Sequence, residues 1–209
     1  MSLPQIDRAQ IARLLRPYAT LTGEQLAKTA LYLDLLLKWN ARMNLTGLRE
    51  PEQMVTRHFG ESFFAASRLM EAGWQGRVID VGSGAGFPGI PIAIWSPQAE
   101  VTLIESNVRK AAFLNEVGRA LEIKNLRVVS QRAELFEGQA ELVTMRAVER
   151  FEDSLPVALR LVEDGGRIGL MIGKEQVARA QETGKALSWS PSVPIPGGHS
   201  RVLLMGTKL

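Results

Sequence analysis

Apolar residues recur at helical spacing along the first third of the chain. Successive groups lie three or four residues apart, as one face of an α-helix requires, and they predict three helices. Thr22 and Gln25 form a capping box at the start of the second helix, and Gly47 and Pro51 lie in the gap before the third. The apolar positions are Ile6, Ile11, Leu14, Leu15, Leu26, Ala30, Leu33, Leu37, Met54, Phe63, Phe64 and Leu69.

The pattern changes near Gly73 to Gly76, where short β-rich runs begin to alternate with helical stretches. This alternation predicts parallel βαβ units, whose ligands bind at the carboxyl ends of the strands. Residues 187–201 hold three prolines and two glycines without a helical pattern, so we expect an antiparallel, hairpin-like ending. The predicted strands span residues 77–81, 100–105, 126–130, 141–145, 167–172 and 201–206, and the predicted helices 108–121, 151–162 and 175–187.

These two patterns predict an α/β protein. We expect a Rossmann-like sheet with helices on both faces, together with an N-terminal helical cap. The change of pattern places the cap at residues 1–76 and the sheet domain at residues 77–209.

A glycine-rich loop follows the first predicted strand, in the run Asp80-Val-Gly82-Ser-Gly84-Ala-Gly86-Phe87-Pro88-Gly89. Glycines at alternate positions allow a tight turn and let a ligand lie against bare backbone. Glu105 ends the next predicted strand, 23 residues after Gly82. A carboxylate at about this spacing can accept hydrogen bonds from both hydroxyls of a ribose.

Three interpretations of the loop compete. A turn without a ligand is disfavoured, because three glycines carry an entropic cost on ordering that needs a reason. A nicotinamide site matches G-x-G-x-x-G from Gly84 to Gly89, but Gly84 lies two residues too late after the strand. Pro88 also stiffens the turn where a pyrophosphate would need free amides. The third interpretation, which we favour, is an S-adenosylmethionine site, because Asp80 and the glycines after it resemble the first motif of class I methyltransferases.

Composition narrows the chemistry further. The 209 residues include no cysteine and only two histidines. Disulfides, zinc–thiolate sites and a thiolate nucleophile are therefore excluded, and we expect no metal. The net charge of +3 is spread along the chain, so any cationic surface for nucleic acid must be assembled by folding. The chain has neither a signal-like start nor an apolar run of membrane length, which predicts a cytoplasmic protein without membrane contact.

The residues that are absent also limit which atoms could accept the methyl group. Methylating carbon 5 of a pyrimidine requires a cysteine nucleophile, and this chain has none. The Asn/Asp-Pro-Pro-aromatic motif typical of adenine amino-methylating enzymes is missing after the fourth predicted strand, where the chain reads Met145-Arg146-Ala147. Guanine N7 remains as an acceptor that needs no strong base, because its lone pair is free at neutral pH. We therefore expect no catalytic acid or base.

Asp80 and the glycines after it resemble the first motif of class I methyltransferases, although Asp80 could also act only as a loop-capping carboxylate. Further short motifs, in order and at matching spacing, resemble the RsmG family, also called GidB, the bacterial 16S ribosomal RNA guanine-N7 methyltransferases. The resemblance covers nearly the whole chain. It rests on Trp39-Asn40, Asn44-Leu45-Thr46, Arg57-His58, the run from Asp80 to Pro91, Arg132-Ala-Glu134 and Arg146-Ala147.

The resemblance implies roles for particular residues. Gly82 and Phe87 would line the methionine end of an S-adenosylmethionine site, and Glu105 would hold the ribose. Gly84 would also bind the cofactor. Ala133 and Glu134 would flank the adenine, and Arg146 would reach the site from the end of the fourth strand. The basic residues expected to contact RNA are Arg132, Lys174 and Arg201.

The chain departs from the family pattern at three places. The family shows Arg-His-Ile-x-Asp-Ser where this chain has Arg57-His58-Phe59-Gly60-Glu61-Ser62. Its Lys-Gly and Arg-His pairs appear here as Gly173-Lys174 and Ser200-Arg201. The last two changes weaken the assignments of Lys174 and Arg201 to RNA, whereas none of the three touches the glycine loop.

The resemblance implies transfer of a methyl group from S-adenosylmethionine to N7 of a guanosine in 16S ribosomal RNA within the small ribosomal subunit. We expect the protein to act as a monomer. Two other functions stay open at this point: a small-molecule methyltransferase, and an RNA-binding module without catalysis. Cofactor binding would separate the module from either enzyme, and a methylated product without RNA would identify the small-molecule enzyme.

Overall fold

The computed structural model describes residues 6–70, 76–146, 151–198 and 200–209. The predicted boundary near Gly73 to Gly76 lies mostly outside these residues. The N-terminal part is helical, and the capping box is present: Gln25 N donates to Thr22 Oγ1, and Thr22 N donates to Gln25 Oε1. The elements are α1 (Arg8–Leu15), α2 (Gly23–Met43), α3 (Pro51–Met54), a π-helix (Val55–Gly60) and α4 (Glu61–Met70).

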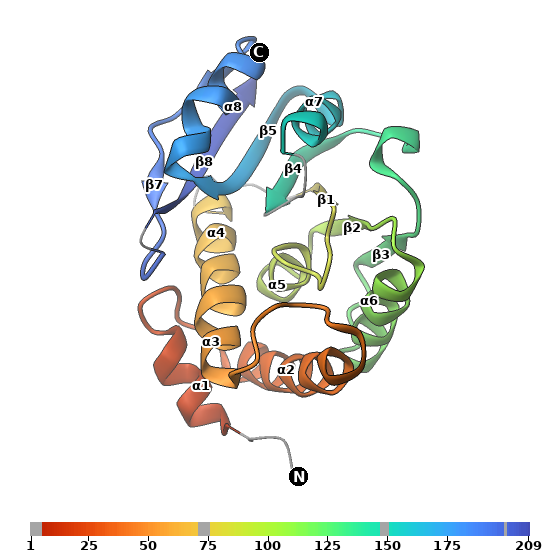
Figure 1. Ribbon diagram of the computed structural model, residues 1–209, viewed down its shortest axis with the longest axis vertical. Coiled ribbons are helices and arrows are strands. Elements are labelled where there is room, and N and C mark those ends of the chain that lie inside the picture. Colours follow the sequence, from red (N-terminus) through yellow and green to blue (C-terminus); the bar gives the residue numbers. More distant parts are fainter. Residues whose placement is uncertain (1–5, 71–75, 147–150, 199) are drawn as a thin grey trace.

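A single mixed sheet follows, in the order β3-β2-β1-β4-β5-β8-β6, with β7 also paired to β8 (Figure 1). The pairs from β3 through β5 are parallel, and β6, β7 and β8 complete the sheet in antiparallel pairing. The α/β prediction and the antiparallel ending are therefore confirmed. The strands are β1 (Arg77–Val81), β2 (Glu100–Ile104), β3 (Leu126–Val129), β4 (Ala140–Arg146), β5 (Val162–Gly173), β6 (Leu187–Trp189), β7 (Val193–Pro194) and β8 (Arg201–Lys208).

Helices cover both faces of this sheet. Alternation along β1 sends Val78 into the core beneath the N-terminal helices and Ile79 into the core beneath the opposite layer. The first layer also holds α5 (Gly89–Trp95) and α6 (Val108–Ala120), and the second holds α7 (Phe151–Arg160) and α8 (Val177–Thr183) (Figure 1). No described helix is both long and apolar enough to cross a membrane.

The predicted helix at residues 175–187 is too long. A short 3-10 helix, Lys174–Gln176, precedes α8, and α8 ends at Thr183. There Gly184 closes a turn in which its carbonyl accepts from Leu187 N at 2.9 Å and from Trp189 Nε1 at 2.9 Å. Leu187 therefore begins strand β6 rather than ending a helix.

The N-terminal helices and the sheet share one hydrophobic core, which includes Leu36 of α2, Phe63 of α4 and Leu142 of β4. Tyr32 of α2 reaches furthest toward the glycine loop: its buried hydroxyl donates to the carbonyl of Ala85. Its ring stacks on Phe87 with centroids 5.3 Å apart. Helix α2 thus holds the loop that follows β1, while the division at residue 76 stays a prediction.

Replacing Tyr32 by phenylalanine should lower the free energy of unfolding by about 1 to 3 kcal/mol, because a buried carbonyl loses its donor while the ring stacking is kept. Urea unfolding at neutral pH measures the change. Tyr18→Phe is the matched control, since it removes a partly exposed hydroxyl and should change stability by less than about 0.5 kcal/mol. Equal losses in the two variants would contradict the role given to Tyr32.

Candidate functional site

A cavity of about 990 Å³ opens at the carboxyl ends of the parallel strands. Five segments line it: residues 45–47 from the N-terminal helical part, 81–85 from the end of β1, 104–107 from the end of β2, 131–134 after β3, and 153–154 of α7. His58 and Arg146 also line it. Strand β1 pairs with β2 on one side and β4 on the other, so the chain reverses its strand order here. Ligands of open α/β sheets bind at this point.

The glycine loop forms the floor of the cavity, and its conformation explains its composition. Gly82, Gly84 and Gly86 have φ values of 66°, 58° and 93°, which only glycine adopts without strain. A Cβ atom at Gly86 would also lie 2.5 Å from the Tyr32 hydroxyl. Gly82 and Gly84 therefore present bare backbone to the cavity, whereas Gly86 is buried against Tyr32 outside the lining.

Asp80 lies behind the loop and not in the cavity lining. Its buried carboxylate accepts from Thr144 Oγ1 at 2.8 Å and from Gly89 N, at the start of α5, at 3.2 Å. Burial raises its pKa to about 6, although the hydrogen bonds from Thr144, Ser83 and Gly89 oppose the rise. Asp80 therefore anchors the loop, as its loop-capping interpretation predicts.

Glu105 lies beside the loop at the end of β2. Its side chain is nearly buried, and its two oxygens accept from Gly84 N and from Asn107 N, each at 2.8 Å. Asn107 in turn caps α6 by accepting from Arg109 N and Lys110 N. Each carboxylate oxygen can accept a second hydrogen bond, so Glu105 can still bind the two hydroxyls of a ribose.

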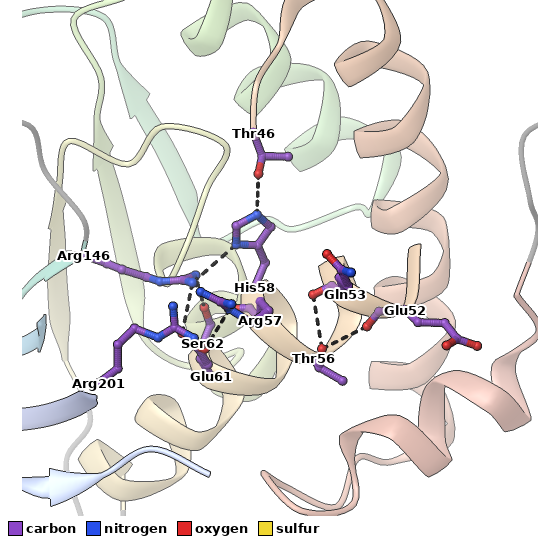
Figure 2. A network of polar contacts seen from close by, with 10 residues as sticks. All are labelled: Thr46, Glu52, Gln53, Thr56, Arg57, His58, Glu61, Ser62, Arg146 and Arg201. Atoms are coloured by element: carbon purple, nitrogen blue, oxygen red, sulfur yellow. Dashed lines mark hydrogen bonds and ion pairs between the residues drawn. The ribbon is translucent and has the colours of Figure 1, made fainter. Parts of the chain in front are cut away.

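Arg146 connects the sheet to the π-helix (Figure 2). Its guanidinium donates to Glu61 Oε2 at 3.1 Å, to the Arg57 carbonyl at 2.5 Å and to Ser62 Oγ at 3.5 Å. It also lies 5.9 Å from the centroid of the Phe87 ring. Burial lowers the pKa of Arg146 to about 10, while the charge of Glu61 opposes the change.

His58 joins three walls of the cavity. Its Nδ1 lies 3.4 Å from Arg146 Nη2, its Nε2 lies 2.6 Å from Thr46 Oγ1, and its ring stacks on Phe87 with centroids 4.9 Å apart. Since arginine only donates, Nδ1 must accept and Nε2 must carry the proton. Burial, and then the charge of Arg146, lowers the pKa of His58 to about 3, so the imidazole is neutral and a poor base.

The GidB family model, described as rRNA small subunit methyltransferase G, matches residues 25–195. Ribosomal RNA small subunit methyltransferase G of Chloroflexus aggregans is 37% identical over 202 residues, which cover 90% of this chain and 84% of that protein. The protein of the same name from Xanthomonas oryzae pv. oryzae is 38% identical over 171 residues, covering 79% and 78%. The chain belongs to the GidB family.

Solved structures support the fold. A SAM dependent methyltransferase from Aquifex aeolicus has a TM-score of 0.62 at 16% identity and covers 79% of this chain and 97% of its own. The ribosomal protein L11 methylase from Lactobacillus delbrueckii subsp. bulgaricus has a TM-score of 0.61 at 15% identity, with coverages of 74% and 80%. The prediction of a Rossmann-like class I methyltransferase sheet is therefore confirmed.

The structure brings most of the predicted site residues to one cavity. The predicted residues that line the cavity are Gly82, Gly84, Phe87, Glu105, Arg132, Ala133, Glu134 and Arg146.

The described residues contain no group of three or more acidic or histidine side chains that could hold a metal ion.

Two of the predicted lining residues have exposed side chains, and the last two predicted residues lie outside the lining. Arg132 and Glu134 form an ion pair of 3.3 Å with each other, and both side chains are more than half exposed. Lys174 is exposed just after β5, outside the lining. Arg201 also lies outside the lining and donates to the buried carboxylate of Glu61. Their contacts with RNA stay predictions.

Sequence reasoning missed several lining residues. Leu45, Thr46 and Gly47 form the wall that the helical part contributes, and Lys110 and Gln131 lie at other edges. The run Asn44-Leu45-Thr46 belongs to the family motifs. Its sequence does not show, however, that the His58 side chain holds Thr46 in place by a hydrogen bond. Glu61 was likewise seen only as a departure from the family pattern.

Stability should depend on pH through His58. The unfolded chain binds a proton there near pH 6.5, whereas the folded chain binds one only near pH 3. Acidification from pH 6.5 to 4.5 therefore removes about 2 kcal/mol of the free energy of unfolding through this residue. His58→Asn lacks this titration. The difference in free energy of unfolding between the natural protein and His58→Asn should therefore narrow by about 2 kcal/mol from pH 6.5 to pH 4.5. Urea unfolding at both pH values measures this difference.

Comparing variants is essential because Asp80, with its raised pKa, contributes in the opposite direction as pH falls. Thr46→Val is the control: it loses the same hydrogen bond but keeps the imidazole, so its deficit should stay nearly constant. Parallel pH curves for His58→Asn and the natural protein would show that His58 remains unperturbed in the fold.

Proposed function

We propose that this protein transfers a methyl group from S-adenosylmethionine to N7 of a guanosine in 16S ribosomal RNA. The observation that carries the proposal is membership of a family named for methylating small-subunit ribosomal RNA. In this chain, the glycine loop and Glu105 meet in one cavity at the carboxyl ends of the strands.

The residues present fit the cofactor. Gly82, Gly84 and Phe87 lie where bare backbone and an aromatic ring would contact the methionine part, and the two oxygens of Glu105 would accept from the ribose hydroxyls. Ala133 and Glu134 on the next wall would flank the adenine. When bound, S-adenosylmethionine supplies an electrophilic methyl group on its sulfonium.

An N7 acceptor suits the polar groups of the cavity. Attack by N7 requires no proton to leave first, and the imidazole that lines the cavity is a poor base because its pKa is about 3. The contribution left to the chain is alignment of the guanine with the methyl group, which can lower a barrier by about 7 to 11 kcal/mol. Arg146, His58 and Thr46 are connected by hydrogen bonds and would form the rigid wall for this alignment.

The RNA would approach from the carboxyl edge of the sheet. Arg132 lies at the cavity rim, and Lys174 and Arg201 lie beyond it. These side chains would contact the RNA strand, because phosphates supply much of the affinity in such complexes. We propose that the substrate is the RNA of the small ribosomal subunit and that the protein acts as a monomer in the cytoplasm.

The methyl-transfer test uses small ribosomal subunits from a strain that lacks the family's enzyme. Incubated with this protein and methyl-labelled cofactor, they should acquire label in 16S RNA, recovered as 7-methylguanine after depurination. Glu105→Ala protein serves as the comparison and should transfer far less at low cofactor concentration. Label that appears on protein or small molecules, and never on RNA, would refute the proposal.

Cofactor affinity tests Glu105. Glu105→Ala should weaken binding by about 1.5 to 3 kcal/mol, roughly 10- to 150-fold, because it removes charge-assisted hydrogen bonds to the ribose and releases Gly84 N. Glu105→Gln keeps one acceptor oxygen and should lose less. Isothermal calorimetry measures both, with Glu137→Ala, an exposed glutamate outside the cavity, as control. Unchanged affinity in Glu105→Ala would remove Glu105 from the site.

A further inference from the structure

Three guanidiniums surround one buried carboxylate beside the cavity (Figure 2). Glu61, at the start of α4, is 1% exposed. Arg146 Nη2 lies 3.1 Å from it, Arg57 Nε lies 3.7 Å from it, and Arg201 Nη2 forms a short ion pair with it. Among the described residues, Glu61 is the carboxylate with which all three arginines form ion pairs. Positive charge is therefore in excess in this cluster.

The cluster also holds hydrogen-bond donors without acceptors. Arg201 Nε is buried and has no partner among the described atoms. The Arg57 guanidinium donates no hydrogen bond within the described part of the chain, and its side chain is 46% exposed. A buried donor without a partner is unfavourable. The side chains of Arg57 and Arg201 are 46% and 25% exposed, so both are open to an acceptor that arrives from outside.

The position of the cluster limits what that acceptor can be. Arg201 begins β8 opposite Gly173, where β5 ends, and Arg146 ends β4, so both lie at the carboxyl edge of the sheet. Arg146 and His58, the neighbour of Arg57, line the cavity, whereas Arg57 and Arg201 do not. The free donors therefore lie next to the cavity rather than inside it.

We propose that Arg57 and Arg201 bind a phosphate group of the RNA strand that carries the target guanosine. The planar fork of a guanidinium matches the two non-bridging oxygens of a phosphodiester, and the single negative charge of that group would offset part of the excess positive charge around Glu61. A guanine that leaves its stack to enter the cavity brings its flanking phosphates to the cavity's edge. The identity of the strand rests on the proposed function.

Arg57 is the residue to change, because its pair with Glu61 is loose and half exposed, so the fold should survive. With small ribosomal subunits as the probe, Arg57→Gln should weaken binding by about tenfold. It should also reduce the slope of log affinity against log salt by about one, since one phosphate contact is lost. Arg57→Lys should keep most of the salt slope but recover only part of the affinity, because it lacks the fork.

Arg119→Gln is the matched control, since Arg119 is exposed near the carboxyl end of α6, at the opposite edge of the sheet. Calorimetry should find the same cofactor affinity in all variants. Arg57→Gln protein that binds subunits with the affinity and salt slope of Arg119→Gln would overturn the phosphate site. Weaker cofactor binding in Arg57→Gln would also overturn it, because the acceptor would then be the carboxylate of the cofactor.

Failure of the proposed function gives a different result. If the natural protein never methylates the subunits, the methyl-transfer activity is refuted. In that case the salt slopes of Arg57→Gln and Arg119→Gln would still differ if the phosphate site exists. The two hypotheses therefore stand or fall on separate measurements.

Discussion

The glycine loop after β1 keeps its shape because side chains from three elements hold its backbone. Asp80 binds Gly89 N from below, the Tyr32 hydroxyl binds the Ala85 carbonyl from α2, and Glu105 binds Gly84 N from the end of β2. A loop of glycines has little conformational preference of its own, so these contacts define the floor of the cavity. All three groups are buried, so water does not compete with the loop for their hydrogen bonds.

The N-terminal helices complete the site as well as covering the sheet. They supply the 45–47 wall, and they bring His58 and Glu61 against Arg146 at the end of β4. The π-helix that carries Arg57 and His58 inserts an extra residue per turn, a distortion that is frequent at functional sites. A helical segment that only covered the sheet would not need four polar contacts to Arg146.

Local patterns predicted much of this structure. The limits of β1 and the start of α6 are found as expected, because a short run of strand residues buried on both faces and a helix N-cap are properties of neighbouring residues. Part of the cavity lining was also predictable from the loop, from Glu105 and from the family motifs. The end of α8 was not, because Gly184 accepts from Trp189, a contact whose geometry the helical pattern of residues 175–187 does not contain.

The sequence by itself determined the fold class, the cofactor loop and the absence of thiol chemistry, since each depends on residue types at short spacing. Tertiary structure decided which distant polar groups meet. Glu61 and Arg201 are 140 residues apart, and His58 and Arg146 are 88 apart, yet both pairs are in contact. Burial then determines the charge state of these groups, because desolvation and neighbouring charges leave His58 neutral beside three arginines.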